Sequence, residues 1–578
     1  MASTIPPGTR SPDPQLLAVA RGDEPADLVL RNGWVVNVFT GEVEKLDVAV
    51  ARGRVAGMGP DYEAHAQVDL EGRYLLPGFL DAHVHIESSM VAPPEFARAV
   101  VPRGTTTAIT DPHEIANVHG LEGIDYMLAA SEGLPMDVFV MASSCVPATP
   151  MGTSGAELTA SDLARYRDHP RVLGLAELMN FPGAIGGDPG VLEKVAMYAH
   201  RVVDGHCPGI SGQDLSAYVA AGPSSDHEAT TAEEALEKLR RGLWVFFRQA
   251  TNARNLDALL PALTPENAGR VALCTDDRQP PDLLDEGGID FMVRRVVAHG
   301  VDPIQAIRLA TLNPANYFGL WDRGAVAPGR RADLVVTSSL EELPVEAVYH
   351  AGQPVAEDGA LVPGLLPDSV APPQPSMHVD ADALDFRIPA REGKARAIGV
   401  VPDQLVTRHE SVEPRVVGDE VVADPEADLL KIAVVERHGR GGGRAVGLVR
   451  GLGFKEGGLA GTVAHDHHNL IVAGADDPSM EVAARRVAEL QGGLAVARDG
   501  AVVAELSLPV GGLMSDRDIH QTREAFEKVV AAARGLGSHL WDPFMALSFL
   551  GLEVIPDLKI TDQGLVDVRT FQPVGLWE

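Results

Sequence analysis

The sequence has little cysteine and comparatively little positive charge. Its 578 residues include only three cysteines, Cys145, Cys207 and Cys274, and no two of them form a CxxC pair. Thiolate zinc knuckles and thioredoxin-like redox chemistry are therefore not expected. So few cysteines in a long chain are typical of a reducing compartment, and we expect the protein to be cytoplasmic.

The charge balance argues against two classes of partner. Lys and Arg number 48 against 81 Asp and Glu, a formal net charge of −33. A nucleic-acid surface needs a basic stripe, and an electrostatic membrane anchor needs basic clusters, so neither partner is expected. No apolar run approaches the roughly 18 residues that span a bilayer. The hydrophobic content of 45% and charged content of 22% are normal for a globular protein.

The pattern of strands and turns divides the chain. Residues 1–25 are polar with several Pro and Gly, and we expect a flexible N-terminal arm. Short β runs separated by glycines fill 26–76 and return in 321–361, which predicts one composite β-sandwich built from both segments. A Pro-rich linker at 362–380 leads to 381–578, where strands (445–449, 501–506) and helices (480–490, 518–534) predict a C-terminal α/β domain.

Between these parts, 77–320 has a different rhythm, in which buried strand runs alternate with helical stretches. The strand runs span 74–85, 105–110, 137–143, 172–178, 202–206, 222–227, 244–249 and 270–277. Eight strand-plus-helix units over about 245 residues match a TIM-like (β/α)₈ barrel. A doubly wound sheet would have fewer strands and a topological switch point, so the barrel is preferred.

An HxH pair ends the first strand run. His83 and His85 point to the same face of a strand, because side chains alternate along it, and both can reach one metal ion. An isolated HxH is more often two hydrogen-bonded histidines.

Here, however, other strand runs also end in histidine or carboxylate. The C-terminal ends of barrel strands meet at one mouth. The residues brought together there are His83, His85, Glu177, His206, His227 and Asp276. Such a set favours two bridged divalent ions.

Longer strings carry a resemblance to a known family. They are PGFLDAHVHIESSM (77–90), GTTT (104–107), DPHEIANV (111–118), LGLAE (173–177), DGHCPG (204–209), SDHE (225–228), CTDDR (274–278) and AHDHHN (464–469). The chain resembles the bacterial and archaeal adenine deaminases of the amidohydrolase superfamily over nearly everything after the N-terminal arm. The flanking small sheet also fits that superfamily.

The resemblance implies a reaction and a ligand set. Members of the family bind two divalent metals, usually Mn²⁺ or Fe²⁺, and convert adenine to hypoxanthine and ammonia; Zn²⁺ would suit the same donors. It implies one ion at His83, His85 and Asp276 and the other at His206 and His227. Glu177 would bridge, where many relatives use a carbamylated lysine. A metal-activated hydroxide would attack C6 of the purine, and Asp276 would move its proton to the leaving amine.

Other residues near the mouth have two readings each. His113 and Glu114 are candidate catalytic residues, with helix capping or support as the alternative. Glu87, Ser88 and Arg248 are candidate substrate-binding residues, although Arg248 could simply pair a carboxylate. Asp277 competes with Asp276 for the role of base, because only one of two adjacent strand residues is expected to face the mouth.

The cluster His465, Asp466, His467 and His468 is either a surface stretch or a loop that folds over the barrel mouth. Gln249, Gln279 and Gly288 depart from the family pattern, which has Glu at the first position and His at the other two in many members. These departures do not affect the predicted metal ligands. They leave open whether the substrate is adenine, another 6-aminopurine or an N6-substituted adenine.

Two alternatives remain beside a purine deaminase, and a third is excluded. A cyclic-amide hydrolase of the same superfamily would place lysine at position 177 and would lack the DPHE string. A non-enzymatic metal scaffold would bind metal without turnover. The cytidine-type deaminase fold is excluded, because no PCxxC follows the HxE at 85–87. The expected partner is a small purine, and relatives being dimers or tetramers predicts a homo-oligomer.

Overall fold

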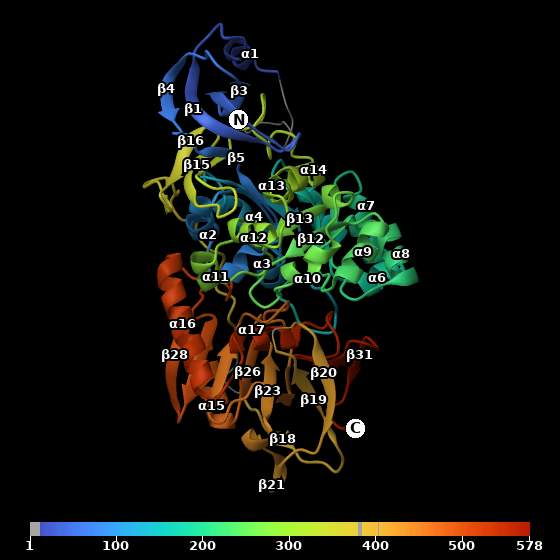
Figure 1. Ribbon diagram of the computed structural model, residues 1–578. Coiled ribbons are helices and arrows are strands. Elements are labelled where there is room, and N and C mark those ends of the chain that lie inside the picture. Colours follow the sequence, from blue (N-terminus) through green and yellow to red (C-terminus); the bar gives the residue numbers. More distant parts are fainter. Residues whose placement is uncertain (1–11, 380–383, 403) are drawn as a thin grey trace.

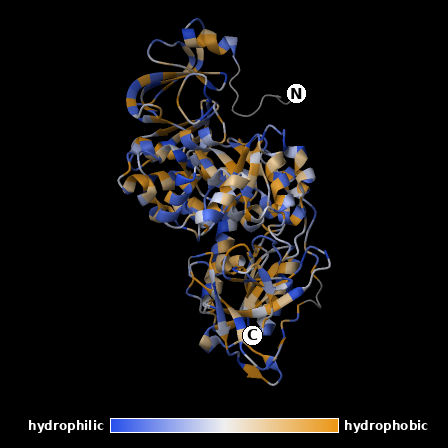
Figure 2. Ribbon diagram, turned by 90° about the vertical axis from the view of Figure 1, so that its right-hand side faces the viewer, coloured by the Kyte–Doolittle hydropathy of each residue, from blue (hydrophilic) through white to orange (hydrophobic). Residues whose placement is uncertain are grey.

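The computed structural model describes residues 12–379, 384–402 and 404–578. Three units lie one above another, a small sheet unit at the N-terminal end, a barrel in the middle and a C-terminal unit below (Figure 1). Figure 2 shows the same stacking from a second direction. Part of the predicted N-terminal arm is helical, because α1 (Pro14–Arg21) packs Val19 against the small sheet; residues 1–11 lie outside the described residues.

The small unit contains one nine-stranded sheet with strands from two distant segments. The first segment supplies β1 (Ala26–Asn37), β2 (Glu42–Ala51), β3 (Arg54–Met58), β4 (Ala64–Asp69) and β5 (Tyr74–Pro77). The second supplies β14 (Leu334–Thr337), β15 (Val345–His350), β16 (Gln353–Glu357) and β17 (Ala360–Leu361). They join where β5 pairs with β1 on one side and β14 on the other. The segment after the barrel therefore completes the sheet begun before it.

The predicted strand 74–85 is in fact two strands, β5 and β6 (Phe79–Val84), which belong to different sheets. The break falls at Gly78. A Cβ at this position would lie 2.2 Å from Thr106 Oγ1, so the chain passes too close to the barrel for any side chain. Its backbone N–H donates to Asp333 O of the small unit. The sequence pattern misses this change of sheet because both strands are apolar.

The barrel contains the eight parallel strands that the sequence predicts, two with the predicted bounds and six shorter. They are β6, β7 (Thr105–Thr110), β8 (Asp137–Ala142), β9 (Val172–Leu178), β10 (Val202–Gly205), β11 (Ser225–Asp226), β12 (Trp244–Arg248) and β13 (Val271–Cys274). β6 to β10 form one hydrogen-bonded sheet and β11 to β13 another. A parallel bridge between Val84 and Asp276 joins the first strand to the last at the C-terminal ends. The barrel thus closes at the place where the candidate site residues lie.

The C-terminal unit is an eight-stranded sheet covered by helices. Two helices that the sequence predicts are present as α15 (Asp477–Glu489) and α16 (Ile519–Gly535), and the predicted strands as β24 (Arg444–Arg450) and β28 (Ala501–Ser507). The short helix α17 (Pro543–Ser548) lies on the side facing the barrel (Figure 1). Residues 362–379, the described part of the predicted linker, form no helix or strand.

Within the described part of the chain, no helix is both long and apolar enough to cross a membrane.

Acid should weaken the contact between the barrel and the C-terminal unit through His119. This residue ends α3 (His113–His119), and its ring lies 3.5 Å from the Cβ position of Gly511. Burial, helped by Arg437, lowers the pKa of His119 to about 4. Between about pH 6.5 and pH 4, His119 therefore binds a proton in the unfolded chain but stays neutral in the folded chain. The free energy of unfolding should fall by at most about 3 kcal/mol as pH drops from 6.5 to 4.

Thermal unfolding of His119→Gln between pH 7 and pH 4.5 measures this contribution. We expect a shallower acid-side fall in the unfolding midpoint than in wild type. His65→Gln, on the exposed strand β4, is the control and should follow the wild-type slope. Equal slopes for His119→Gln and wild type would refute the assignment.

Candidate metal centre

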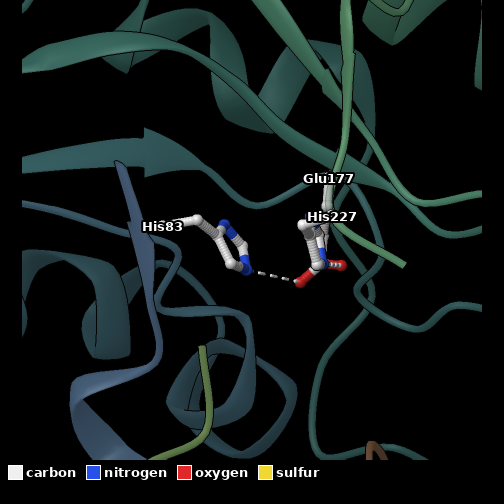
Figure 3. Close-up of side chains that lie close together, drawn as sticks. All are labelled: His83, Glu177 and His227. Carbon is white, nitrogen blue, oxygen red and sulfur yellow. Dashed lines mark ion pairs between the residues drawn. The ribbon is translucent and has the colours of Figure 1, made fainter. Parts of the chain in front are cut away.

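Histidines and carboxylates from five barrel strands meet at the C-terminal mouth. His83 lies in β6 and His85 directly follows it, Glu177 lies in β9, and His206, His227 and Asp276 come just after β10, β11 and β13. Figure 3 shows His83 from one strand pointing toward Glu177 and His227 from others. All six side chains are buried. The structure therefore brings together the whole set predicted from the strand ends.

Glu177 is the centre of this group. Its Oε1 lies 3.6 Å from His83 Nε2, 3.2 Å from His85 Nε2 and 3.5 Å from His113 Nδ1. Its Oε2 lies 2.7 Å from His206 Nδ1 and 3.2 Å from His227 Nε2. One carboxylate thus contacts five imidazoles, with the HxH pair on one oxygen and the later histidines on the other. The two oxygens of Glu177 therefore face two different groups of histidines.

The protonation pattern of His85 tests whether the site suits a cation. Its Nδ1 lies 3.0 Å from the carbonyl oxygen of Asp111, which can only accept, so Nδ1 carries the hydrogen. In the neutral ring the Nε2 lone pair then faces Glu177 Oε1 and Asp276 Oδ1, each at 3.2 Å, and His83 Nε2 at 3.1 Å. In that state the His85 lone pair and two carboxylate oxygens face one another, and a bound cation would relieve their repulsion. Metal-ligating histidines commonly donate their other N–H to a carbonyl in this way.

The shifts in pKa agree with a need for positive charge. Burial would lower the pKa of His85, but the carboxylates of Asp276 and Glu177 raise it well above its ordinary value. Burial would raise the pKa of Glu177, but the surrounding histidines, His227 first, hold it well below its usual range. The site is a cage of ionised carboxylates and imidazoles, which fits divalent cations.

Asp276 and Asp277 both line the cavity, so the expectation that only one of them could face the mouth was wrong. Strand alternation does not apply to them, because β13 ends at Cys274 and Asp276 has a φ of 56°. Asp276 Oδ1 lies 3.4 Å from His83 Nε2, whereas Asp277 Oδ1 accepts a hydrogen bond of 2.5 Å from Ser88 Oγ. Asp276 is therefore the one that contacts the HxH pair.

Arg248 and Glu228 also line the cavity and form an ion pair with each other. Both Arg248 terminal nitrogens contact Glu228, with Nη2 3.1 Å from Oε2, and Nη1 also donates to Asp276 Oδ2 at 3.0 Å. Glu228 Oε1 lies 3.5 Å from His227 Nε2. Sequence reasoning did not single out Glu228, although it is the last residue of the SDHE string. Arg248 pairs two carboxylates here, which is the second of its two predicted readings.

His113 and Glu114 face the mouth rather than capping their helix. They begin α3, whose N-terminus has no side-chain cap. His113 Nδ1 lies 3.0 Å from Asp111 Oδ2, and its Nε2 lies 3.6 Å from Asp466 Oδ1. Glu114 Oε1 accepts from Ser88 Oγ at 3.1 Å. Both residues line the cavity beside Glu177.

Glu87 and Ser88 lie one step behind these residues. Glu87 Oε1 accepts from the backbone N–H of Ile115 at 3.3 Å, and Ser88 Oγ contacts Glu114 and Asp277. The residues that line the cavity include neither of them. Ser88 therefore contacts two lining carboxylates, and Glu87 contacts the backbone of α3 next to Glu114.

The C-terminal unit forms the opposite wall of the cavity. It contributes Leu405, His465, Asp466, Phe549, Leu552 and Ile555. The cluster His465 to His468 is buried, so it is the predicted loop over the mouth and not a surface stretch. The space between the two walls is about 20 Å³, room for about one water.

Comparison with known proteins agrees with this geometry. Residues 74–355 match the amidohydrolase family, and residues 404–572 match the adenine deaminase C-terminal domain. The chain is 52% identical to an adenine deaminase of Desulfatibacillum aliphaticivorans, over 98% of this chain and 100% of that protein. It is 50% identical to one of Cereibacter sphaeroides (96% and 98% covered) and 49% identical to adenine deaminase 2 of Carboxydothermus hydrogenoformans (98% and 100%). The chain belongs to the adenine deaminase family of amidohydrolases.

Proposed function

We propose that this protein catalyses the hydrolytic deamination of adenine to hypoxanthine and ammonia. The similarity to adenine deaminases over nearly the whole chain supports this substrate. The observation that carries the chemistry is Glu177, whose two oxygens contact five imidazoles. Three departures from the family pattern left the identity of the purine substrate undecided. None of these residues lines the cavity: Gln249, Gln279 and Gly288.

Two divalent cations would be held by the residues that the family resemblance implies. Mn²⁺ or Fe²⁺ is the preferred candidate, and Zn²⁺ is the alternative. His83, His85 and Asp276 would hold one, and His206 and His227 the other, with Glu177 between them. Imidazole and carboxylate donors suit all three metals. When bound, such cations lower the pKa of water and so supply a nucleophile at neutral pH.

The chain's own residues must move the protons. Deamination requires that one proton leaves the attacking water and that one reaches the departing amine. Asp276 is proposed for both transfers, and its contacts support this role: Oδ2 accepts from Arg248 Nη1 at 3.0 Å, while Oδ1 faces the histidines. His113 and Glu114, on the same side of the cavity, are the proposed groups for proton transfer to the purine ring. Arg248 is proposed to act by orienting Asp276, and Glu87 and Ser88 by orienting Glu114 and Asp277.

The setting of the enzyme follows from the family resemblance and the cysteines. All three cysteines are buried free thiols, which suits a reducing cytoplasm. A dimer or tetramer is proposed from the family resemblance, and light scattering of the purified protein measures it.

Adenine turnover by the purified, Mn²⁺-loaded protein tests the function. We expect hypoxanthine and ammonia in equal amounts, loss of activity after chelation, and its return when Mn²⁺ is added. Guanine, N6-methyladenine and hydantoin, assayed in parallel, cover the other substrates. Ring opening of hydantoin without ammonia release from adenine would replace the proposal with a cyclic-amide hydrolase. Faster turnover of N6-methyladenine would shift the substrate class.

A further inference from the structure

Asp466 of the C-terminal unit has a buried carboxylate oxygen that nothing in the described chain satisfies. The residue lies in the loop between β25 (Gly458–Gly461) and β26 (Leu470–Gly474), is 3% exposed and lines the cavity. Its Oδ1 lies 3.6 Å from His113 Nε2 and 3.7 Å from His465 Nδ1, but its Oδ2 has no hydrogen-bond partner. Leaving such an oxygen unpaired costs free energy, so a donor from a bound molecule is the natural partner.

The position of Asp466 limits which donor this is. His113 lies between it and the metal cage, since Nδ1 of that ring is 3.5 Å from Glu177 Oε1 and Nε2 is 3.6 Å from Asp466 Oδ1. Asp466 is therefore about one imidazole ring away from the cage. A purine whose C6 lies at the cage keeps its exocyclic amine there and extends its five-membered ring away from it. The N–H that remains for Asp466 is the one on the five-membered ring.

The surroundings of Asp466 suit a flat ring with one polar edge. The His465 ring stacks on Phe549, with ring centroids 4.4 Å apart and an angle of 7° between the planes. Leu552 and Ile555 complete an apolar wall, and both are buried. No other carboxylate of the C-terminal unit is among the residues lining the cavity. The wall thus offers one ionic acceptor among apolar and aromatic groups.

We propose that Asp466 accepts a hydrogen bond from the five-membered-ring N–H of the purine and so selects the free base over 9-substituted purines. This inference rests on the proposed function and names the residue that defines its substrate class. A purine that carries a sugar or a methyl group at N9 loses the donor and leaves the carboxylate unpaired. Sites built to bond an N–H reject analogues without it far more strongly than apolar pockets reject an extra group.

The test compares adenine with 9-methyladenine. Wild type should prefer adenine strongly in kcat/KM. Asp466→Ala should lower kcat/KM for adenine by at least about 10-fold and lower the adenine to 9-methyladenine ratio by a similar factor, because a hydrogen bond to a charged group is lost. Asp466→Asn, which keeps the shape and a weaker acceptor, should shift the ratio in the same direction by less. It decides the matter if the alanine variant does not fold.

A matched control and a binding measurement separate recognition from support of the fold. Asp562→Asn alters another buried carboxylate of the C-terminal unit. Asp562 is not among the residues that line the cavity, and its Oδ1 accepts a hydrogen bond from Thr153 N at 2.8 Å. Its substrate ratio should equal that of wild type. Calorimetric titration with hypoxanthine and 9-methylhypoxanthine should show the same loss of discrimination in Asp466→Ala without any turnover.

Each failure has a distinct meaning. An unchanged ratio in the Asp466 variants, or a wild type that accepts 9-methyladenine as readily as adenine, would overturn this inference and leave the deaminase intact. A wild type without any adenine turnover would overturn the proposed function itself.

Discussion

Glu177→Gln should strongly weaken metal binding at the cage and, with it, lower turnover. The carboxylate contacts imidazoles on both of its oxygens, at 2.7 to 3.6 Å. An amide offers one oxygen and one NH₂ group, so it cannot serve both sides, and its hydrogens would point at nitrogen lone pairs. Breaking a buried charge pair costs about 3–5 kcal/mol, which corresponds to roughly a 10²- to 10⁴-fold loss of cation affinity. The largest loss of activity of any single substitution is expected here.

Metal content per chain, measured on protein purified from Mn²⁺-supplemented cells, checks the expectation alongside kcat. Asp137→Asn is the matched control. Asp137 begins β8 at the opposite end of the barrel and pairs with Arg323, so its loss affects stability and not the mouth. That variant should keep its metals and its kcat. A Glu177→Gln protein with full metal content would mean that Glu177 does not lie between the cations.

The cage was predictable because barrel topology converts sequence position into spatial position. Strand runs that end in His or Glu must meet at one mouth once the fold is a barrel. The six residues from His83 to Asp276 are consequently neighbours in space although they are far apart in sequence. This prediction depended only on where the strands end. Buried parallel strands are easy to recognise in this sequence because they form continuous apolar runs.

What could not be predicted depends on local backbone or on contacts between units. Asp277 joins the lining because Asp276 takes a positive φ, which no strand pattern reveals. Glu228 contacts both His227 and Arg248, and no strand pattern reveals that its side chain reaches them. The position of the 464–469 loop depends on how the C-terminal unit docks, and the sequence therefore left open whether it is a surface stretch or a loop over the barrel mouth. Docking between units leaves no periodic signal in either one.

Asp276→Asn is expected to lower kcat by about 10²- to 10⁴-fold, the range for removal of a general acid–base group. Asparagine keeps an oxygen that can face His83 and His85, so metal content should be retained or only partly lost. It cannot take up a proton, and proton transfer is the function proposed for the Asp276 carboxylate. Measuring kcat and metal content on the same sample separates this effect from the loss of metal expected for Glu177→Gln.

Asp277→Asn is the comparison that decides between the two neighbours. Both carboxylates line the cavity, but Asp277 Oδ1 is taken by the Ser88 hydroxyl at 2.5 Å, whereas Asp276 contacts the histidines and Arg248. If position in the hydrogen-bond network sets the role, Asp277→Asn should cost no more than about 10-fold in kcat, the lower end for loss of a supporting contact. A larger loss of kcat in Asp277→Asn than in Asp276→Asn would assign the role of base to Asp277. The residue that accepts the proton needs an ionisable carboxylate, so its replacement by asparagine should cause the larger loss.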